Sequence, residues 1–115
     1  MAIVFVIARD WTLRAGLRAE LREHGINALG MESADDAGRA IAAGQIPALT
    51  VIEAIPETVS DPAIESLVAR VPTILIASRT QTVPLPPVDT VLYRPLRIGE
   101  IVARIRELLG RGHTA

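Results

Sequence analysis

Residues 2–10, AIVFVIARD, decide the fold of this chain. Residues 2–8 contain no polar side chain and are rich in β-branched ones, a pattern typical of a strand buried on both faces of a parallel sheet. The run is too short for a membrane or secretory segment, and it leads directly into Arg9 and Asp10. We therefore expect a central strand with polar residues at its carboxyl end.

The remaining elements alternate between strands and helices. Four further strands are expected at residues 26–31, 49–53, 73–77 and 90–93. The helices are expected around the leucines at 13, 17 and 21 before Gly25, from Ser33 to about Ala43, after Asp61-Pro62, and from Ile98 to Gly110. Three prolines in four positions, 84, 86 and 87, exclude a regular helix from residues 78–89, so that connection should be an extended loop.

This alternation determines the fold class. Strands joined by short helical connections require right-handed crossovers and a parallel sheet covered on both faces. We predict an α/β fold with a doubly wound five-stranded parallel sheet in the order 2-1-3-4-5, in which the fourth helix is missing or replaced by the proline-rich loop. Residues 1–110 should form one domain and residues 111–115 a frayed tail. Ligand sites in such sheets lie beyond the carboxyl ends of the first and third strands.

Composition narrows the function. The chain has 12 basic and 13 acidic residues, a net charge of −1, and 3% aromatic residues, which does not favour a nucleic-acid or membrane partner. It has no cysteine and only two histidines, His24 and His113, so thiolate zinc sites, disulfides and thiol catalysis are excluded. A cytoplasmic location is expected. Every basic residue is an arginine.

At several positions the chain resembles the receiver domain of two-component response regulators, over roughly residues 3–109. The features that carry the resemblance are VIARD at 6–10 leading into LR at 13–14, Gly25 after the first helix, Pro47 and Pro72 before the third and fourth strands, and VLYRPL at 91–96. The Arg94-Pro95 step matches a Lys-Pro step of receivers in which the peptide bond is usually cis. The resemblance therefore implies a cis peptide before Pro95.

The resemblance also implies an active site, which this chain alters. Receivers use an acidic pair after the first strand to bind magnesium, an aspartate after the third to accept phosphate, and a lysine after the fifth. The acidic pair falls here on Ala8 and Arg9, with Asp10 one place late. The phosphate acceptor falls on Glu53, and the lysine on Arg94.

The switch positions of receivers are altered as well. The hydroxyl residue after the fourth strand falls on Ala77, with Ser78 one place late. The aromatic switch residue falls on Val91, while Tyr93 lies one strand period further along. The resemblance thus points to a degenerate receiver, a pseudo-receiver.

Charge supports the same interpretation. A working receiver pocket gathers three carboxylates against one ammonium and needs a divalent cation, whereas Asp10 and Glu53 here face Arg9 and Arg94. A guanidinium could occupy the magnesium position and pair bidentately with Glu53. We expect no catalytic residue, no magnesium, no other cofactor and no acyl phosphate, with Asp10 serving as a helix-start residue. Glu53 remains open to three interpretations: a solvated carboxylate, an ion pair with Arg9 or Arg94, or a fixed mimic of the phosphorylated state.

Two functions follow. The first is a non-catalytic, phosphorylation-independent interaction module in two-component signal transduction, whose partner is a histidine kinase, an output domain or a second copy. The alternative is a phosphate-accepting or anion-binding receiver in which Arg9, Arg79 and Arg94 converge on a phosphorylated ligand. Trp11 is either an exposed interaction anchor or a lid over the altered pocket.

Overall fold

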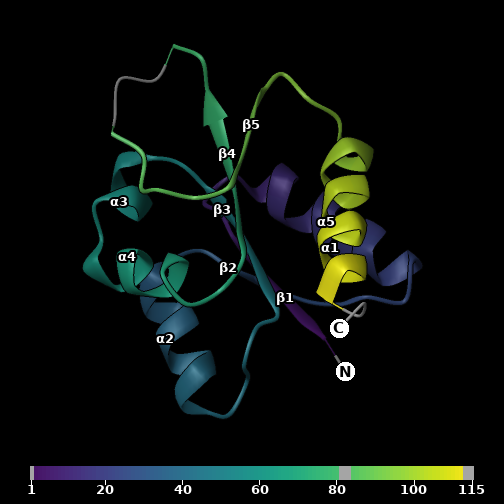
Figure 1. Ribbon diagram of the computed structural model, residues 1–115, viewed down its shortest axis with the longest axis horizontal. Helices are drawn as coiled ribbons and strands as arrows, with labels where there is room; N and C mark the ends of the chain where they lie inside the picture. The colour runs from purple at the N-terminus through teal and green to yellow at the C-terminus, as the bar shows by residue number, and fades with distance from the viewer. Residues whose placement is uncertain (1, 81–83, 113–115) are drawn as a thin grey trace.

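The computed structural model describes residues 2–80 and 84–112, and it has the predicted architecture. Five parallel strands form one sheet in the order β2-β1-β3-β4-β5, with helices on both faces (Figure 1). The strands are β1 (Ile3–Ile7), β2 (Asn27–Met31), β3 (Leu49–Glu53), β4 (Thr73–Ser78) and β5 (Thr90–Arg94). The helices are α1 (Trp11–Glu23), α2 (Ala34–Ala42), α3 (Pro56–Val59), α4 (Pro62–Val68) and α5 (Ile98–Gly112).

Alternation along the strands divides the core into two layers. Successive side chains of a strand point to opposite faces of the sheet, so Val4 and Val6 of β1 face one layer while Phe5 and Ile7 face the other. Helices α1 and α5 cover the first layer, and α2 and α4 cover the second, as Figure 1 shows on its two sides. All four of these β1 side chains are fully buried, which explains why the strand has no polar residue.

The helix boundaries follow the predicted caps. Asp10, Ser33 and Asp61 each stand before a helix and accept hydrogen bonds from its first N–H groups. After α1, Gly25 adopts a φ of +73°, a left-handed conformation that ends helices and that glycine tolerates best. The last helix extends to Gly112, two residues beyond the expected end at Gly110, and the rest of the predicted tail lies outside the described residues.

The connection between β4 and β5 contains no helix in its described parts, residues 79–80 and 84–89. Leu85 and Val88 instead pack against the second core layer, so the proline-rich chain itself covers that end of the sheet. Residues 81–83 of the predicted loop lie outside the described residues. The Arg94-Pro95 peptide is cis, as the resemblance implied.

The short helix α3, which begins with Pro56 directly after Ile55, was not predicted; its four residues are too few to produce a periodic apolar pattern. In the described part of the chain, no helix combines the length and the apolar character needed to cross a membrane.

Candidate functional site

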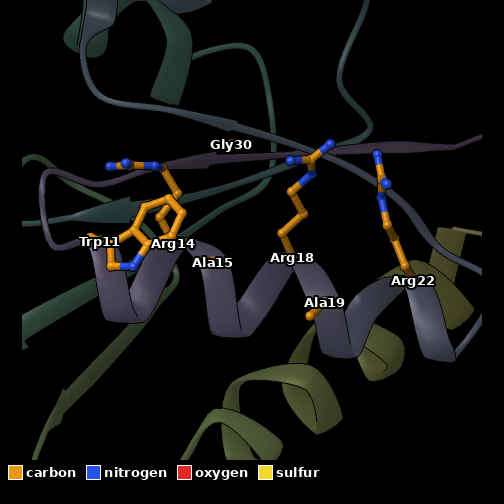
Figure 2. Close-up of a pocket in the computed structure, with 7 residues that line it drawn as sticks. All are labelled: Trp11, Arg14, Ala15, Arg18, Ala19, Arg22 and Gly30. Atoms are coloured by element: carbon orange, nitrogen blue, oxygen red, sulfur yellow. The ribbon is translucent and has the colours of Figure 1, made fainter.

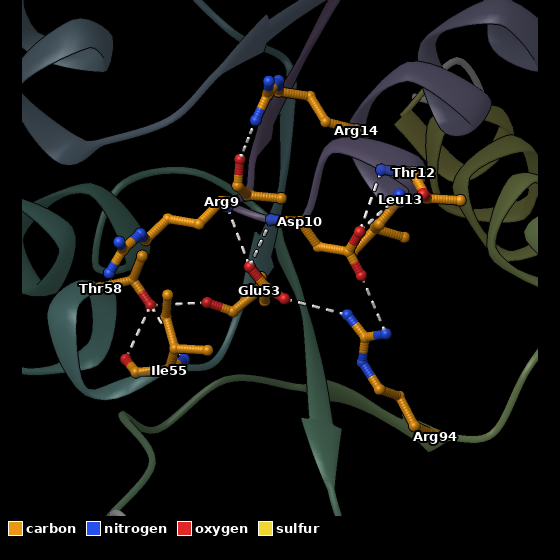
Figure 3. Close-up of polar contacts among 10 residues, drawn as sticks. Arg9, Asp10, Thr12, Leu13, Arg14, Glu53, Ile55, Thr58 and Arg94 are labelled. Atoms are coloured by element: carbon orange, nitrogen blue, oxygen red, sulfur yellow. Dashed lines mark hydrogen bonds and ion pairs between the residues drawn. The ribbon is translucent and has the colours of Figure 1, made fainter.

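The candidate site lies at the carboxyl edge of the sheet, and its residues come from the ends of β1, β3 and β5. Glu53 is the last residue of β3, and its side chain is only 11% exposed. Its Oε1 accepts hydrogen bonds from the backbone N–H groups of Arg9, at 2.9 Å, and Asp10, at 3.2 Å. Its Oε2 accepts from Nη2 of Arg94 at 3.0 Å, as Figure 3 shows. Both oxygens of the carboxylate are therefore bonded within the protein.

A single guanidinium joins two carboxylates at this site. While Nη2 of Arg94 bonds Glu53, its Nη1 lies 3.3 Å from Oδ2 of Asp10 (Figure 3). The expected bidentate pair between one arginine and Glu53 is therefore wrong in detail, because Arg94 divides its two nitrogens between two partners. The planar fork of arginine supplies a separate nitrogen for each carboxylate, whereas a lysine would have to contact both from one nitrogen.

The side chain of Arg9 does not take part, although its backbone does. Its Nη1 pairs with Oε1 of Glu57 at 3.3 Å, and both side chains are more than half exposed. Of the two ion pairs considered for Glu53, the one with Arg94 is formed and the one with Arg9 is not. The reason is α3: this unpredicted turn carries Glu57 to the outer side of the chain at Arg9, while the Arg9 N–H points inward to Glu53.

Asp10 caps α1 and completes the pair with Arg94. Its Oδ1 accepts from the N–H groups of Thr12 at 3.0 Å and Leu13 at 3.3 Å. The Leu13 N–H, helped by the positive charge of Arg94 and the Thr12 N–H, holds the pKa of Asp10 below its usual value of 3.8, against the opposing effect of burial. Its position as a helix-start residue matches the expectation, and both of its oxygens are engaged.

Thr58 and Arg14 bond the backbone of the residues that form the site. The hydroxyl of the buried Thr58 donates to the carbonyl oxygen of Glu53 at 2.6 Å and accepts from the N–H of Ile55 at 3.2 Å. Nη1 of Arg14 donates to the carbonyl oxygen of Ala8, which is itself buried, at 2.6 Å. Neither residue was predicted as part of the site, although Arg14 belongs to a stretch that carries the resemblance. A threonine at the third position of a helix opened by proline was the available signal for Thr58.

The switch positions lie on the two neighbouring strands: Ala77 and Ser78 end β4, whereas Val91 lies near the start of β5. Ala77 is buried, and Val91 packs partly against the second core layer. The Ser78 hydroxyl lies 2.9 Å from that of Thr80 and accepts its N–H at 3.3 Å. Tyr93 is 40% exposed, which leaves its ring accessible to the chain that follows β4.

The three arginines of the anion-binding alternative have separate partners in this structure. The guanidinium of Arg79 lies over the ring of Tyr93, 4.8 Å from its centroid. Arg9 pairs with Glu57, and Arg94 bridges Asp10 and Glu53. Their guanidinium groups do not converge on one point.

The magnesium site implied by the resemblance can be tested against these contacts. Asp10 and Glu53 are the two carboxylates at the site, and both already bond the guanidinium of Arg94. Over residues 2–80 and 84–112, no cluster of three or more histidine, aspartate or glutamate side chains is placed to hold a metal ion. The residues present do not fit the magnesium ion of an active receiver.

Comparison with known proteins identifies the fold. No protein-family model and no curated protein matches the sequence. Among solved structures, a two-component response regulator from Clostridium difficile has a TM-score of 0.81 and 16% identity, covering 99% of this chain and 100% of that chain. A response regulator receiver protein from Burkholderia phymatum has a TM-score of 0.79 and 18% identity, covering 96% of each chain.

A third similar structure places this fold within a longer protein. NtrX from Brucella abortus, solved in complex with ATP, has a TM-score of 0.77 and 15% identity, and the match covers 96% of this chain but 27% of that one. The sheet order, the cis peptide before Pro95 and these matches agree with one another. The chain has the flavodoxin-like fold of response regulator receiver domains.

Proposed function

We propose that this chain is a pseudo-receiver, a non-catalytic protein-interaction module of two-component signalling that works without phosphorylation. The observation that supports this proposal is that both carboxylate oxygens of Glu53 accept hydrogen bonds from within the protein. One carboxylate oxygen accepts from two backbone N–H groups, and the other accepts from Arg94. A phosphate acceptor needs an oxygen free to attack, with a cation beside it to neutralise the incoming phosphoryl group.

The charges at the site also support a receiver that binds no magnesium. Asp10 and Glu53 together carry two negative charges, and Arg94 supplies one positive charge between them. Four backbone N–H groups add to this stabilisation, two on each carboxylate. The sequence led us to expect two arginines opposite these two carboxylates. Because Arg9 is paired with Glu57, only Arg94 supplies a positive charge here. Both carboxylates nevertheless have partners within the protein, and a divalent cation would have to displace Arg94.

The partner under this proposal is a protein: a histidine kinase, an output domain or a second copy of the chain. The outer face of α5 supports docking, since it presents polar side chains such as Glu107, which pairs with Arg104 at 3.0 Å. On the opposite face of the sheet, Leu85 and Val88 take the place of a helix after β4. A partner that recognises a helix there would not fit this chain.

The proposal is tested by offering the protein a phosphoryl group and its analogue. The ¹⁵N-labelled protein is mixed with magnesium and beryllofluoride, and separately with magnesium and acetyl phosphate, while an aspartate-containing receiver serves as the positive control. We expect no change in the amide signals of Asp10, Glu53 and Ser78, and no gain of phosphoryl mass. Saturable shifts at these three residues would support the phosphate-accepting alternative instead.

An anion-binding role is separated by a third arm without magnesium. Inorganic phosphate is titrated into the protein, and the amide signals of Arg9, Arg79 and Arg94 are followed. Saturable shifts at all three would mean that these arginines leave their present partners to bind the anion together. The pseudo-receiver proposal predicts only small, salt-like changes, equal to those produced by chloride at the same ionic strength.

A further inference from the structure

A second site lies on the side of the molecule formed by α1 and the edge strand β2. It is a groove of about 280 Å³, visible in Figure 2, and we call it the arginine groove. Trp11 stands at one end, and arginines follow along the helix at every fourth position. The arginines are Arg14, Arg18 and Arg22, and the floor consists of Ala15, Ala19 and Gly30.

Arg14 is a structural part of this groove. Its guanidinium bonds the Ala8 carbonyl oxygen, pairs with Glu32 at 3.4 Å, and lies 5.4 Å from the centre of the Trp11 ring. Its aliphatic stem lies on Gly30, where an added Cβ would come within 3.0 Å of the Arg14 Cγ. Arg14 therefore fixes Trp11 at the end of the groove, and Trp11 is 69% exposed there instead of covering Glu53.

Arg18 and Arg22 are different, because their charges are available. Both side chains are exposed and extend from α1 on the same side, as Figure 2 shows. Within the described part of the chain, neither makes a hydrogen bond or an ion pair. Two like charges four residues apart on a helix destabilise it slightly. An anionic partner would remove this repulsion and gain two ion pairs.

We propose that the arginine groove binds an extended acidic segment of a partner protein. Four helical residues separate Arg18 from Arg22 by about 6 Å along the axis, close to the roughly 6.7 Å between alternate residues of an extended chain. The small side chains of the floor leave room for a peptide backbone. The groove also borders β2, an edge strand whose outer side has no strand neighbour, and such edges accept extended peptides.

Trp11 adds a second requirement on the segment. It lies about 10 Å from Arg18 along the helix axis, the length of roughly three extended residues. An exposed tryptophan at the end of a groove favours an apolar side chain. The segment should therefore carry two acidic residues separated by one neutral residue. An apolar residue should lie about three positions from the nearer acidic residue.

This inference rests on the proposed interaction role, because it names the chemistry of a protein partner, but it does not depend on Glu53. The two can fail separately. Beryllofluoride shifts at Glu53 would overturn the phosphorylation-independent role and leave the groove untouched, whereas loss of peptide binding would remove the groove and leave the closed Glu53 site as described.

The test uses the full chain and a synthetic fluorescein-labelled peptide of this design, made in both sequence directions, at about 50 mM salt to limit screening. Fluorescence anisotropy measures affinity, and unlabelled peptide is followed by the emission of Trp11, the single tryptophan. We expect saturable binding of one direction and amide shifts in β2 and α1. The double variant R18Q/R22Q should weaken binding about tenfold, from two pairs of roughly 0.7 kcal/mol each.

The matched control is R70Q/R106Q, which removes the same charge from exposed arginines outside the groove. It should change affinity by less than about twofold. Equal weakening by both double variants would overturn the proposal, as would equal binding of a peptide with glutamine in place of glutamate. Tighter binding of a charge-matched oligothymidylate, or of phosphatidylserine vesicles, would assign the groove to a nucleic acid or a membrane instead. Absence of peptide binding up to about 1 mM would also overturn it.

Discussion

Replacing Arg94 by methionine tests whether its guanidinium holds the candidate site together. Methionine keeps the apolar stem of the side chain and removes the charge, so the variant reports on the bridge alone. In the wild type this guanidinium contacts Glu53 at 3.0 Å and Asp10 at 3.3 Å. Its removal leaves the nearly buried Glu53 carboxylate with backbone donors only.

The expected loss of unfolding free energy in R94M lies between two limits. A hydrogen bond to a charged group contributes about 1.5–3 kcal/mol, whereas an exposed ion pair contributes about 0–1 kcal/mol. The Arg94 side chain is 40% exposed, and that of Glu53 is 11% exposed, so solvent screens the contact in part. We expect R94M to lower the free energy of unfolding by about 1.5 kcal/mol. For a chain of this length that is a fall in Tm of about 6 °C.

Urea unfolding followed by circular dichroism measures this difference, and the chain supplies a matched control. Arg9 and Glu57 form an ion pair whose side chains are 61% and 57% exposed, so R9M should cost less than about 0.5 kcal/mol. A cycle of R94M with E53Q should give a coupling of about 1 kcal/mol between the two residues. The reasoning is refuted if R94M and R9M cost the same within about 0.3 kcal/mol, or if the cycle shows no coupling.

Three further outcomes are expected. E53D shortens the side chain by one methylene, so it should lose part of its bonding and cost about 1 kcal/mol of unfolding free energy, while mass spectrometry after acetyl phosphate still finds no phosphoryl group. T58V removes the hydroxyl that bonds the Glu53 carbonyl and the Ile55 N–H, which keep their bond to each other at 3.0 Å, and should cost about 1 kcal/mol in urea unfolding; a cost near zero would contradict this role. Asp10 has a lowered pKa in the folded state, so its ionised form stabilises the fold above its usual pKa of 3.8, and this contribution is lost as the pH falls through the lower folded value. The stability difference between wild type and D10N should therefore be constant above about pH 5 and narrow below 3.8; a difference that widens in acid would contradict the lowered pKa.

The fold could be predicted from the sequence because its strands and helices produce apolar patterns that extend over many residues. Continuous apolar strands and four-residue leucine spacing extend over many residues and agree with the caps at Asp10, Ser33 and Asp61. The unpredicted element, α3, is four residues long and is held by a few local hydrogen bonds, made by the Thr58 hydroxyl and by backbone N–H groups that donate to Ile55. Such a turn depends on single contacts, which periodicity does not report.

The sequence predicted which residues form the candidate site, but it did not predict which arginine pairs with which carboxylate. Topology alone places the carboxyl ends of β1, β3 and β5 at the same edge of the sheet, so Asp10, Glu53 and Arg94 could be named as candidates for one site. Which arginine pairs with which carboxylate depends on side-chain direction. Arg9 follows β1 with its N–H turned toward Glu53, and its side chain therefore reaches the opposite side, to Glu57.

The contacts of Ala8 show why one substitution would not restore a phosphate switch. A receiver requires acidic residues at Ala8 and Arg9, but Ala8 is 1% exposed and its carbonyl oxygen already accepts from Arg14. A carboxylate placed there would be buried beside Glu53, and it would be stable only with a metal ion or a further cation. Arg94 occupies the space between the existing carboxylates, so it would have to be replaced in the same step. Because these residues contact one another, their effects are not additive, and each single reversion should cost stability without gaining phosphorylation.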